Sequence, residues 1–514
     1  MTATGRRSVW VFADQCNAAS AHLAEATPET TTVLFVVALD KIRSAPWHRQ
    51  RLHLILATMW RFADELRHAG FDVDWRVASS MSAGVEAHLR GHQPSVLRVM
   101  RPSNRAGVAV LERLVARHGD LIEVVPDDRF LCSADEFIAW ADAHRRRDGS
   151  VLMEDFYRWQ RRRLGILVDA DGAPEGGTWN LDHENRLPPP RDGGTWPDTV
   201  RTPLDDVDTQ VEAFIDGIDG LTLTGAAWDG TWATDRAGAR ERLHHFIDTA
   251  LVGFGPYEDA VVSHHWHLNH SLISPYLNLG VLHPRDVVDA VMEARATTDL
   301  PLNSVEGFLR QVIGWREYIH GIYWWRDAEY VESNHLEATD PLPPAFCGGP
   351  TEMNCVAHTA QWVHDYGWTH HIPRLMVLAN LATLAGVNPR ELLGWMHASF
   401  IDGADWVMVP NVIGMGTYAD GGMMSTKPYV SGGNYISKMT DFCRGCHFDR
   451  SARTGERACP FTTLYWDFLD RHREQLASNH RMGRMYANLG RLADLDEVRS
   501  RAVEVRTRLA SGTL

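Results

Sequence analysis

Three cysteines near the C-terminus have a spacing that suits metal binding. Cys443 and Cys446 form a C-x2-C pair, and Cys459 follows with Pro460 directly behind it. A C-x2-C turn points two thiolates at one ion, and a proline after the last ligand recurs in iron–sulfur proteins. The spacing therefore predicts a metal site. An iron–sulfur cluster and zinc fit it equally well, and unliganded buried thiols are the remaining alternative.

A closed tetrahedral site needs a fourth ligand, which Cys355, His358 or His447 can supply by tertiary folding. The N-terminus runs into a strand-like stretch without an apolar signal region, and no later run approaches the roughly 20 residues of a membrane helix. We therefore expect a cytoplasmic protein with no membrane segment. Because that compartment disfavours structural disulfides, the seven cysteines favour a metal or redox role.

The charge balance bears on which partners the protein can have. The 514 residues carry a formal net charge of -15, which argues against indiscriminate nucleic-acid binding, since phosphate affinity comes from Lys and Arg. The runs Arg145–Arg147 and Arg161–Arg163 are candidates for a local basic face. The alternative for both runs is a solvated helix face.

The pattern of apolar residues predicts two folding units. Residues 8 to 128 alternate short apolar runs with helix-period segments, which predicts a doubly wound parallel sheet covered by helices on both faces. No GxGxxG follows the first run, so an ordinary dinucleotide fingerprint is absent. Residues 165 to 206 are rich in Gly, Pro and Asp and cannot sustain a regular element.

From about residue 207 onward the sequence shows amphipathic helices and almost no strand signal. One helical stripe comprises Val305, Phe308, Leu309, Val312, Ile313, Ile319 and Ile322. We therefore expect an N-terminal α/β domain over residues 1–135, a helix and linker over 136–206, and a helical domain over 207–514.

Several longer stretches resemble one known family. HSLISPYLNLGVLHPRDV (residues 270–287) is similar to the flavin-phosphate loop of the photolyase/cryptochrome family. EGFLRQVIGWREYIHGIYWW, MNCVAHTAQWVHDYGWTHHIPRLMVLAN and VPNVIGMGTYADGGMMSTKPYVSGGNYISKMTDFCRGCHFD resemble its iron–sulfur bacterial branch, the prokaryotic (6-4) photolyases and related cryptochromes. The likeness runs from about residue 8 to about residue 490.

The resemblance implies specific cofactors and the residues that hold them. The ligands of the branch's 4Fe–4S cluster are matched by Cys355, Cys443, Cys446 and Cys459. The resemblance therefore favours an iron–sulfur cluster over zinc. The helical domain is implied to bury FAD, and the N-terminal domain is implied to be able to hold a 6,7-dimethyl-8-ribityllumazine antenna. The implied FAD-binding residues are Asn269, Ser271, Leu272, Ser274, Arg316, Asn380, Asp402, Asp405, Met408 and Asn411.

The resemblance also implies a light-driven reaction on DNA that contains a pyrimidine lesion. Reduced flavin donates an electron to a flipped-out lesion, and in the (6-4) case a histidine donates a proton. His370 and His371 match the family's active-site pair, and a histidine near its ordinary pKa can exchange a proton around neutrality. Tyr429 matches a residue that contacts the lesion. Trp395 matches an electron-transfer position, and Asp182 matches a linker acid that holds a divalent cation such as Mg²⁺.

Several positions depart from the family pattern. Cys347 and Met396 replace aromatic residues of the row that relays electrons to oxidised flavin, so we expect poor photoreduction by the usual route. Met408 replaces a carboxylate near the flavin N5, and Ala404 replaces a bulky aromatic residue, which predicts a wider substrate cavity. Val36 replaces an acid of the antenna pocket, although Asp14 and Gln15 of the neighbouring loop are kept.

Two main functions and one further alternative follow. The first is light-driven repair of (6-4) or related pyrimidine lesions by a monomeric enzyme. The second is a blue-light photoreceptor that signals to a protein partner without repairing DNA. The third is a flavoprotein that transfers electrons in the dark. The histidine pair, Tyr429 and the basic runs favour repair, whereas Cys347, Met396, Ala404 and Met408 favour the photoreceptor or an altered chemistry on another substrate.

Overall fold

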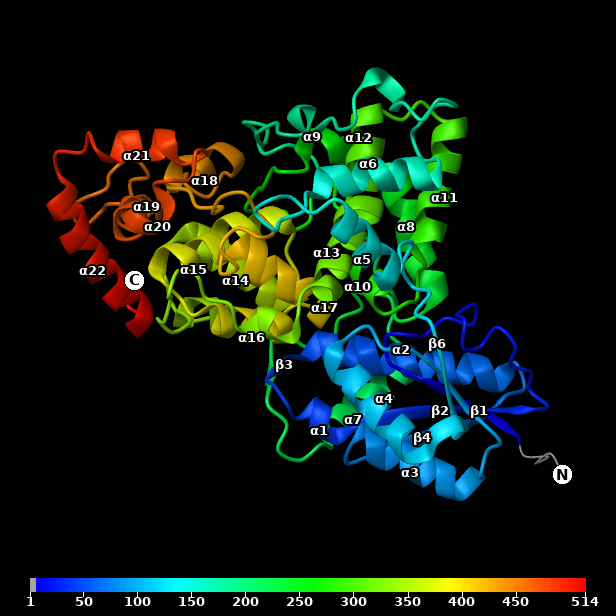
Figure 1. Cartoon of the computed structure of the whole chain (residues 1–514). Coiled ribbons are helices and arrows are strands. Elements are labelled where there is room, and N and C mark those ends of the chain that lie inside the picture. Colours follow the sequence, from blue (N-terminus) through cyan, green and yellow to red (C-terminus); the bar gives the residue numbers. More distant parts are fainter. Residues whose placement is uncertain (1–5) are drawn as a thin grey trace.

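The protein consists of an N-terminal α/β part and a larger helical part, and the computed structural model describes residues 6–514 (Figure 1). Five parallel strands form one sheet in the order β4-β2-β1-β5-β6. The strands are β1 (Arg7–Val11), β2 (Thr31–Ala38), β4 (Asp72–Ala78), β5 (Leu97–Met100) and β6 (Ile122–Val125). Because the chain winds outward from β1 in both directions, this is the doubly wound sheet that the sequence predicts.

Helices cover the sheet on both faces, and β2 is buried along its whole length, as expected for a strand between two helical layers. The elements of this part, besides the sheet strands, are α1 (Leu39–Ile42), β3 (Trp47–His48), α2 (Arg49–His68), α3 (Met81–His92), α4 (Arg105–His118) and η1 (Gly119–Leu121). Figure 1 shows this part in blue, at the opposite end of the molecule from the red C-terminal helices.

The helical part begins with α5 (Ala134–Ala143) and α6 (Met153–Leu164) and continues after the linker. Its further elements are α8 (Arg236–Thr249), α9 (Leu251–Tyr257), α10 (Ser274–Asn278), α11 (Pro284–Thr297), α12 (Leu302–Leu309), η4 (Arg310–Trp315), α13 (Arg316–Trp325), η5 (Ala328–Glu332), η6 (Pro344–Cys347), α14 (Asn354–Tyr366), η7 (Pro373–Ala379), α15 (Asn380–Ala385), α16 (Pro389–Ser399), α17 (Asp405–Val409), η8 (Pro410–Gly416), α18 (Gly433–Met439), α19 (Pro460–Arg471), α20 (Arg473–Leu476), α21 (Gly483–Leu489) and α22 (Leu495–Ser511). The predicted stripe on residues 305–322 is buried throughout. Among the described residues, no helix combines the length and the hydropathy that crossing a bilayer requires.

The linker contains only the short turns η2 (Glu175–Gly177) and η3 (Asp182–Glu184), as the Gly/Pro-rich composition predicts. The expected start of the helical domain at residue 207 needs correction. Helix α7 (Asp206–Asp216) buries Val211 and Ile215 in the apolar core that lies between the sheet and α2. Strand β7 (Leu223–Thr224) also pairs with β3 of the N-terminal part. The N-terminal unit therefore also includes helix α7, which follows the linker in the sequence.

The expected basic face on α6 is also corrected by the structure. Arg161 is fully buried and donates to backbone carbonyls of Ile166, Leu167 and Trp179. Arg163 pairs with Glu136 at 2.6 Å. These guanidinium groups fasten the linker and α5 to α6, so they are not available to phosphates.

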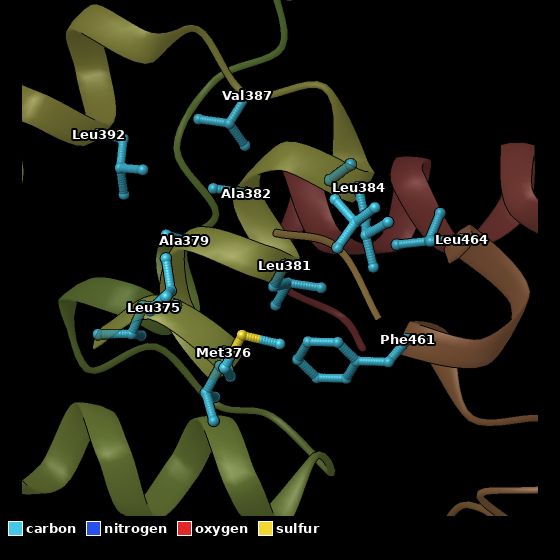
Figure 2. Packing of buried hydrophobic residues seen from close by; sticks show 14 of the residues in the cluster. Leu375, Met376, Ala379, Leu381, Ala382, Leu384, Val387, Leu392, Phe461 and Leu464 are labelled. Carbon is cyan, nitrogen blue, oxygen red and sulfur yellow. The ribbon is translucent and has the colours of Figure 1, made fainter. Parts of the chain in front are cut away.

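The largest apolar core joins the middle of the helical part to its C-terminal helices. Figure 2 shows Phe461 and Leu464 of α19 pointing toward Met376 of η7 and toward Leu381 and Leu384 of α15. Since α19 begins directly after Cys459, this packing fixes the position of one predicted metal ligand.

His48 joins the two parts of the protein in its neutral form. Its Nδ1 accepts from the backbone N–H of Gln50 and caps α2, while its Nε2 lies 2.9 Å from the carbonyl oxygen of His364 on α14. This arrangement needs a proton on Nε2 and none on Nδ1. Burial lowers the pKa of His48 to about 4.

We expect this histidine to make folding sensitive to acid. The unfolded chain binds a proton below the ordinary histidine pKa of about 6.5, whereas folded His48 does not until about 4, so stability is lost as pH falls through that window. The expected loss from His48 alone between pH 7.5 and pH 5 is about 2 kcal/mol.

Urea unfolding of wild type and of a His48→Asn variant at both pH values checks this. Asparagine keeps a capping acceptor but cannot be protonated, so the pH dependence of the variant should be shallower. Equal pH dependence in the two proteins would contradict the assignment.

Candidate functional site

A cavity of about 880 Å³ lies in the helical part of the protein. Three π-helical segments contribute to its wall, namely η4 with Gln311 and Trp315, η7 with Leu375, and η8 with Asn411 and Met415. Such segments widen a helix by one residue and are frequent at functional sites. A cavity of this size, walled by apolar residues with a few polar groups, is typical of a cofactor or substrate site.

The segment that precedes α10 forms one wall of this cavity. Ser271, Leu272 and Ser274 line it, and Leu272 has a φ of 55°, in the left-handed region that a leucine rarely adopts. Ser274 Oγ donates to Asp402 Oδ2 at 2.7 Å, and Arg374 pairs with the same carboxylate at 3.0 Å. The loop is thus held in a strained conformation by charged partners behind it, as happens at ligand-binding sites.

Arg316 supplies a buried positive charge to the same wall. Its guanidinium lies over the rings of Phe130 and Trp406, at 4.3 and 5.3 Å, and pairs with the fully buried Glu317 at 2.6 Å. Burial lowers the pKa of Arg316, and its Nε has no hydrogen-bond partner within the protein. A cation that keeps an unused donor next to a cavity suits an anionic ligand.

A second cavity of about 220 Å³ shares His270, Ser274, His371 and Asn411 with the large one. It contains buried polar atoms that no protein group satisfies. These atoms are both ring nitrogens of His370, Nε2 of His270 and Oγ1 of Thr369. Unpaired buried polar atoms are costly, so the two adjoining cavities together fit a polar ligand.

Four histidines meet where the two cavities join. The rings of His270 and His370 stack at 4.3 Å, and His267 lies close enough to influence His370 electrostatically. His371 faces both cavities, so its exposed surface lies inside the protein. Burial, together with the charge of Arg374, lowers the pKa of His371 to about 4. The cluster is therefore neutral at pH 7 when no ligand is bound.

The mouth of the large cavity carries basic and aromatic side chains. Lys427, Lys438 and Arg186 line it together with Tyr429, whose side chain is 39% exposed. These groups come from the linker and from the segment around α18, which are far apart in sequence. Arg186 pairs with Asp182, whereas Lys427 and Lys438 have no carboxylate partner among the ion pairs of the described residues, so the two lysines supply the unpaired positive charge.

Acidic groups lie beside the linker turn η3. Burial alone would raise the pKa of Asp182, but Arg310 and Arg186 both pair with its carboxylate and lower that pKa. Burial raises the pKa of Glu258 to about 8, and burial with the charge of Asp182 raises the pKa of Asp259 to about 6. All three acids line the large cavity.

Four cysteines from three segments line one small cavity of about 20 Å³. Cys355 lies on α14, Cys443 and Cys446 follow α18, and Cys459 caps α19. Burial, followed by the other three thiols, raises the pKa of Cys355 well above its usual value. Deprotonation of this quartet in the fold therefore needs a compensating cation.

The spacing of the four sulfurs distinguishes a cluster from a single ion. Zinc holds each sulfur at about 2.3 Å, which places the sulfurs of a tetrahedral site about 3.8 Å apart. Here no three of the four sulfurs lie within 4.8 Å of one another, whereas the Asp74, His88 and His92 group does meet that limit among the described residues. The four sulfurs are thus spaced more widely than the sulfurs around one zinc ion.

Comparison with known proteins identifies the family. Residues 9–218 match the family of deoxyribodipyrimidine photo-lyase-related proteins. The chain is 37% identical over 498 residues to a (6-4) photolyase of Agrobacterium fabrum, which covers 95% of this chain and 96% of that protein. The chain belongs to the photolyase/cryptochrome family.

Solved structures agree with this fold. A bacterial class III photolyase from Agrobacterium tumefaciens superposes with a TM-score of 0.56 at 16% identity, covering 99% of this chain and 98% of that one. A cryptochrome from Synechocystis superposes with a TM-score of 0.57 at 12% identity, covering 98% of this chain and 99% of that one. As a photolyase-family flavoprotein the chain uses FAD, and the paired cavities provide room and unsatisfied polar atoms for it.

The structure gathers most of the FAD-binding and active-site residues that the resemblance implied. Those that line the large cavity are Ser271, Leu272, Ser274, Arg316, Asp402, Asn411, His371, Tyr429 and Asp182. His370 and Met408 line only the smaller cavity.

Four residues that the resemblance implied line neither cavity. Asn269 donates to the Gly253 carbonyl, and Asp405 pairs with His397 at 3.3 Å. Asn380 is fully buried and exchanges hydrogen bonds with Ser431. Trp395 packs on phenylalanines. These four residues therefore make contacts within the protein and do not border either cavity.

The departures from the family pattern have unequal consequences. Ala404 caps α17 and lines neither cavity, which corrects the expectation that it widens the substrate cavity. Met396 and Met408 do line the smaller cavity. Cys347 is exposed on η6 and lies outside both cavities.

The residues expected for an antenna do not form a pocket for lumazine. Val36 is buried beneath Gly84 of α3, with no room for a Cβ on that glycine. Asp14 pairs with Arg129 at 2.7 Å, and the Gln15 side chain is hydrogen-bonded to backbone groups. A cavity of about 570 Å³ borders Cys16, but Asp14, Gln15 and Val36 do not line it.

Some residues of the site were not foreseen from the sequence. His270, Trp368 and Arg374 join the cavity wall or its support. His270 ends the run HHWHLNH, a density of histidines that is itself a signal. The pairing of Arg374 with Asp402 across 28 residues has no local signature.

Proposed function

We propose that this protein repairs (6-4) pyrimidine photoproducts in DNA, using light and reduced FAD. The observation that carries the proposal is the place of His371, which faces the cavity beneath a mouth lined by Lys427, Lys438 and Tyr429. The relative that matches nearly the whole chain is named a (6-4) photolyase, which supports the same activity here.

The positive mouth suits DNA that presents a damaged base pair. Lys427 and Lys438 can neutralise phosphates next to a flipped nucleotide, and Tyr429 can stack on an unpaired base. A lesion that already pairs badly costs least to extrude, so the cavity selects damaged sites. We expect binding to weaken only modestly with salt, because the salt dependence grows with the number of phosphates neutralised and few cations are available here.

The chain's own residues assign parts of the cavity to FAD. Ser271 and Arg316 provide hydroxyl and guanidinium donors for its diphosphate, while Ser274, which donates to Asp402, holds the loop in place. Asn411 offers a further polar contact in the cavity. When bound and reduced, FAD supplies an electron to the lesion on illumination. His371 donates a proton to the lesion that has received the electron. It can carry that proton because a phosphate-rich ligand raises the pKa of a neutral histidine beside it.

We assign a 4Fe–4S cluster to Cys355, Cys443, Cys446 and Cys459. The four thiols line one cavity, they are spaced more widely than the sulfurs around one zinc ion, and Cys355 lies far from the other three in the sequence. The cluster would join α14 to the C-terminal helices. Its role is structural.

Two further groups do not fit, and no step is assigned to them. Asp182 is neutralised by Arg186 and Arg310, so Mg²⁺ would have to displace both guanidinium groups. The side chains of Asp14 and Gln15 already bond within the protein, so these two residues offer no free group to lumazine.

Repair is tested by illuminating chemically reduced protein with (6-4) and cyclobutane lesion oligonucleotides and analysing the products. We expect loss of the (6-4) lesion under blue light. His371→Ala should slow this repair by about 10²–10⁴-fold, the usual contribution of general acid catalysis. The matched control is His244→Ala, because His244 is exposed on α8 and lines neither cavity.

Affinity for lesion DNA should stay within a few-fold of wild type in the His371 variant. Wild-type protein that leaves both lesions intact in the light would remove the repair function.

A photoreceptor without repair is the second candidate function. Met408 favours it, since a thioether in the smaller cavity cannot exchange protons with a flavin as a carboxylate does. A receptor would bind lesion DNA no better than intact duplex. Competition between damaged and intact oligonucleotides therefore separates the two functions without any measurement of repair.

A further inference from the structure

Three aromatic side chains form a row that starts at the wall of the large cavity. Trp368 lines both cavities, and its ring centroid lies 5.5 Å from that of Trp266. Trp266 in turn stacks on Tyr366 at 4.2 Å, with the ring planes 17° apart. Trp368 is buried, whereas Trp266 and Tyr366 are partly exposed. The row therefore joins the cavity to the protein surface through rings in contact.

The chemistry of these rings suits one-electron transfer. Indole and phenol lose an electron far more readily than any other uncharged aromatic side chain, and transfer between rings slows steeply with each gap. Tyr366 is the last residue of α14, where its phenol can release a proton to water. Trp232 also lies 6.0 Å from Trp266, but it is fully buried and leads no further outward.

The position that the family uses for electron transfer lacks such a row. Trp395 lines neither cavity, and its aromatic neighbours are Phe346 at 5.3 Å and Phe400 at 5.8 Å. A benzene ring is too hard to oxidise to relay an electron. Trp395 is partly exposed and so reaches the surface, but among the described residues its ring contacts are with phenylalanines only, and none of them continues as indole or phenol to the cavity.

Another aromatic contact at the cavity wall also ends at phenylalanine. Trp315 lines the large cavity and lies 6.1 Å from Tyr318. The next rings beyond Tyr318 are Phe137 and Phe156. This second row is therefore interrupted before it reaches the tryptophans on α5 and α6.

We propose that Tyr366, Trp266 and Trp368 relay electrons from the surface to photoexcited, oxidised flavin in the cavity, an inference that rests on the flavin-dependent function proposed above. Trp368 gives one electron to the excited flavin, Trp266 refills Trp368, and Tyr366 refills Trp266. Tyr366 loses its phenolic proton to water. The net products are a flavin reduced by one electron, a neutral tyrosyl radical and a hydrated proton, and a dissolved thiol returns one hydrogen atom to Tyr366.

The test compares photoreduction of oxidised, FAD-loaded variants in blue light with dithiothreitol. Trp266→Phe should slow flavin reduction by more than an order of magnitude, because it places a benzene ring in the middle of the row. The matched control, Trp395→Phe, should photoreduce like wild type. Wild-type rates in Trp266→Phe, or a loss confined to Trp395→Phe, would overturn the route.

A second readout does not depend on the flavin rate. Electron paramagnetic resonance of illuminated wild type, without thiol, should show a tyrosyl radical that is missing in Tyr366→Phe. Tyr366 is partly exposed at a helix end, so this variant decides the question even if Trp266→Phe does not fold. An unchanged tyrosyl signal in Tyr366→Phe would refute the assignment.

Repair by chemically reduced protein separates this route from the proposed repair function. Trp266→Phe should repair (6-4) lesions like wild type when dithionite supplies the electrons, since Trp266 lines neither cavity. Photoreduction that depends on Trp266 in a protein that repairs no lesion would support the route and refute the repair.

Discussion

Replacement of Cys355 by alanine should remove iron from the purified protein and leave most of the chain insoluble. Cys355 is the one ligand on α14, while the other three thiols belong to the segment between α18 and α19. A structural metal centre contributes on the order of 10 kcal/mol to folding. Because whole proteins are stable by only about 5–15 kcal/mol, its loss unfolds the C-terminal helices.

Iron and sulfide analysis, visible absorbance and far-ultraviolet circular dichroism measure this result. Cys347→Ala is the matched control, because Cys347 is exposed on η6 and lies outside the cysteine-lined cavity. The control should keep its iron and its fold. Wild-type protein that contains zinc and no sulfide would contradict the cluster.

Replacement of Arg316 by methionine should both strip flavin from the protein and destabilise the flavin-free fold. The change removes the one cation that pairs with the fully buried Glu317. Leaving a buried charge without its partner typically costs about 3–5 kcal/mol. The same change removes the guanidinium that faces the cavity, so flavin affinity is lost as well.

The double variant Arg316→Met with Glu317→Gln separates the two effects. A neutral amide no longer needs a cation, so urea unfolding of the flavin-free double variant should recover part of the lost stability. Flavin content, measured after denaturation, should stay low. A double variant that regains flavin would show that Arg316 acts only on Glu317 and not on the cofactor.

Local sequence patterns predicted the sheet and the long helices correctly because their periodicity reflects burial. The alternation in residues 8–128 gives five parallel strands, and the stripe on residues 305–322 is buried. The same reasoning placed α7 in the wrong unit. Its apolar stripe at Val211 and Ile215 shows that one face is buried, but not against which neighbour.

The roles of individual side chains could not be predicted in the same way, because they depend on tertiary contacts that the spacing of residues along the sequence does not reveal. The run Arg161–Arg163 has the composition of a phosphate-binding face, yet Arg161 is buried against linker carbonyls. Trp266 and Tyr366 stack although a hundred positions separate them in sequence. No local pattern predicts such a contact. The residue-by-residue resemblance, in contrast, assigned Ser271 and His371 to one site, and both line the large cavity.

Asn380 connects the segment that carries Tyr429 with the helices next to the four cysteines. Its amide holds Ser431, two residues after Tyr429, and its helix α15 packs on α19, which begins directly after Cys459. The proposed docking face for DNA therefore shares its scaffold with the proposed cluster. Under this proposal, iron starvation is expected to weaken binding to lesion DNA as well as to remove the cluster, so that immature protein does not occupy damaged sites.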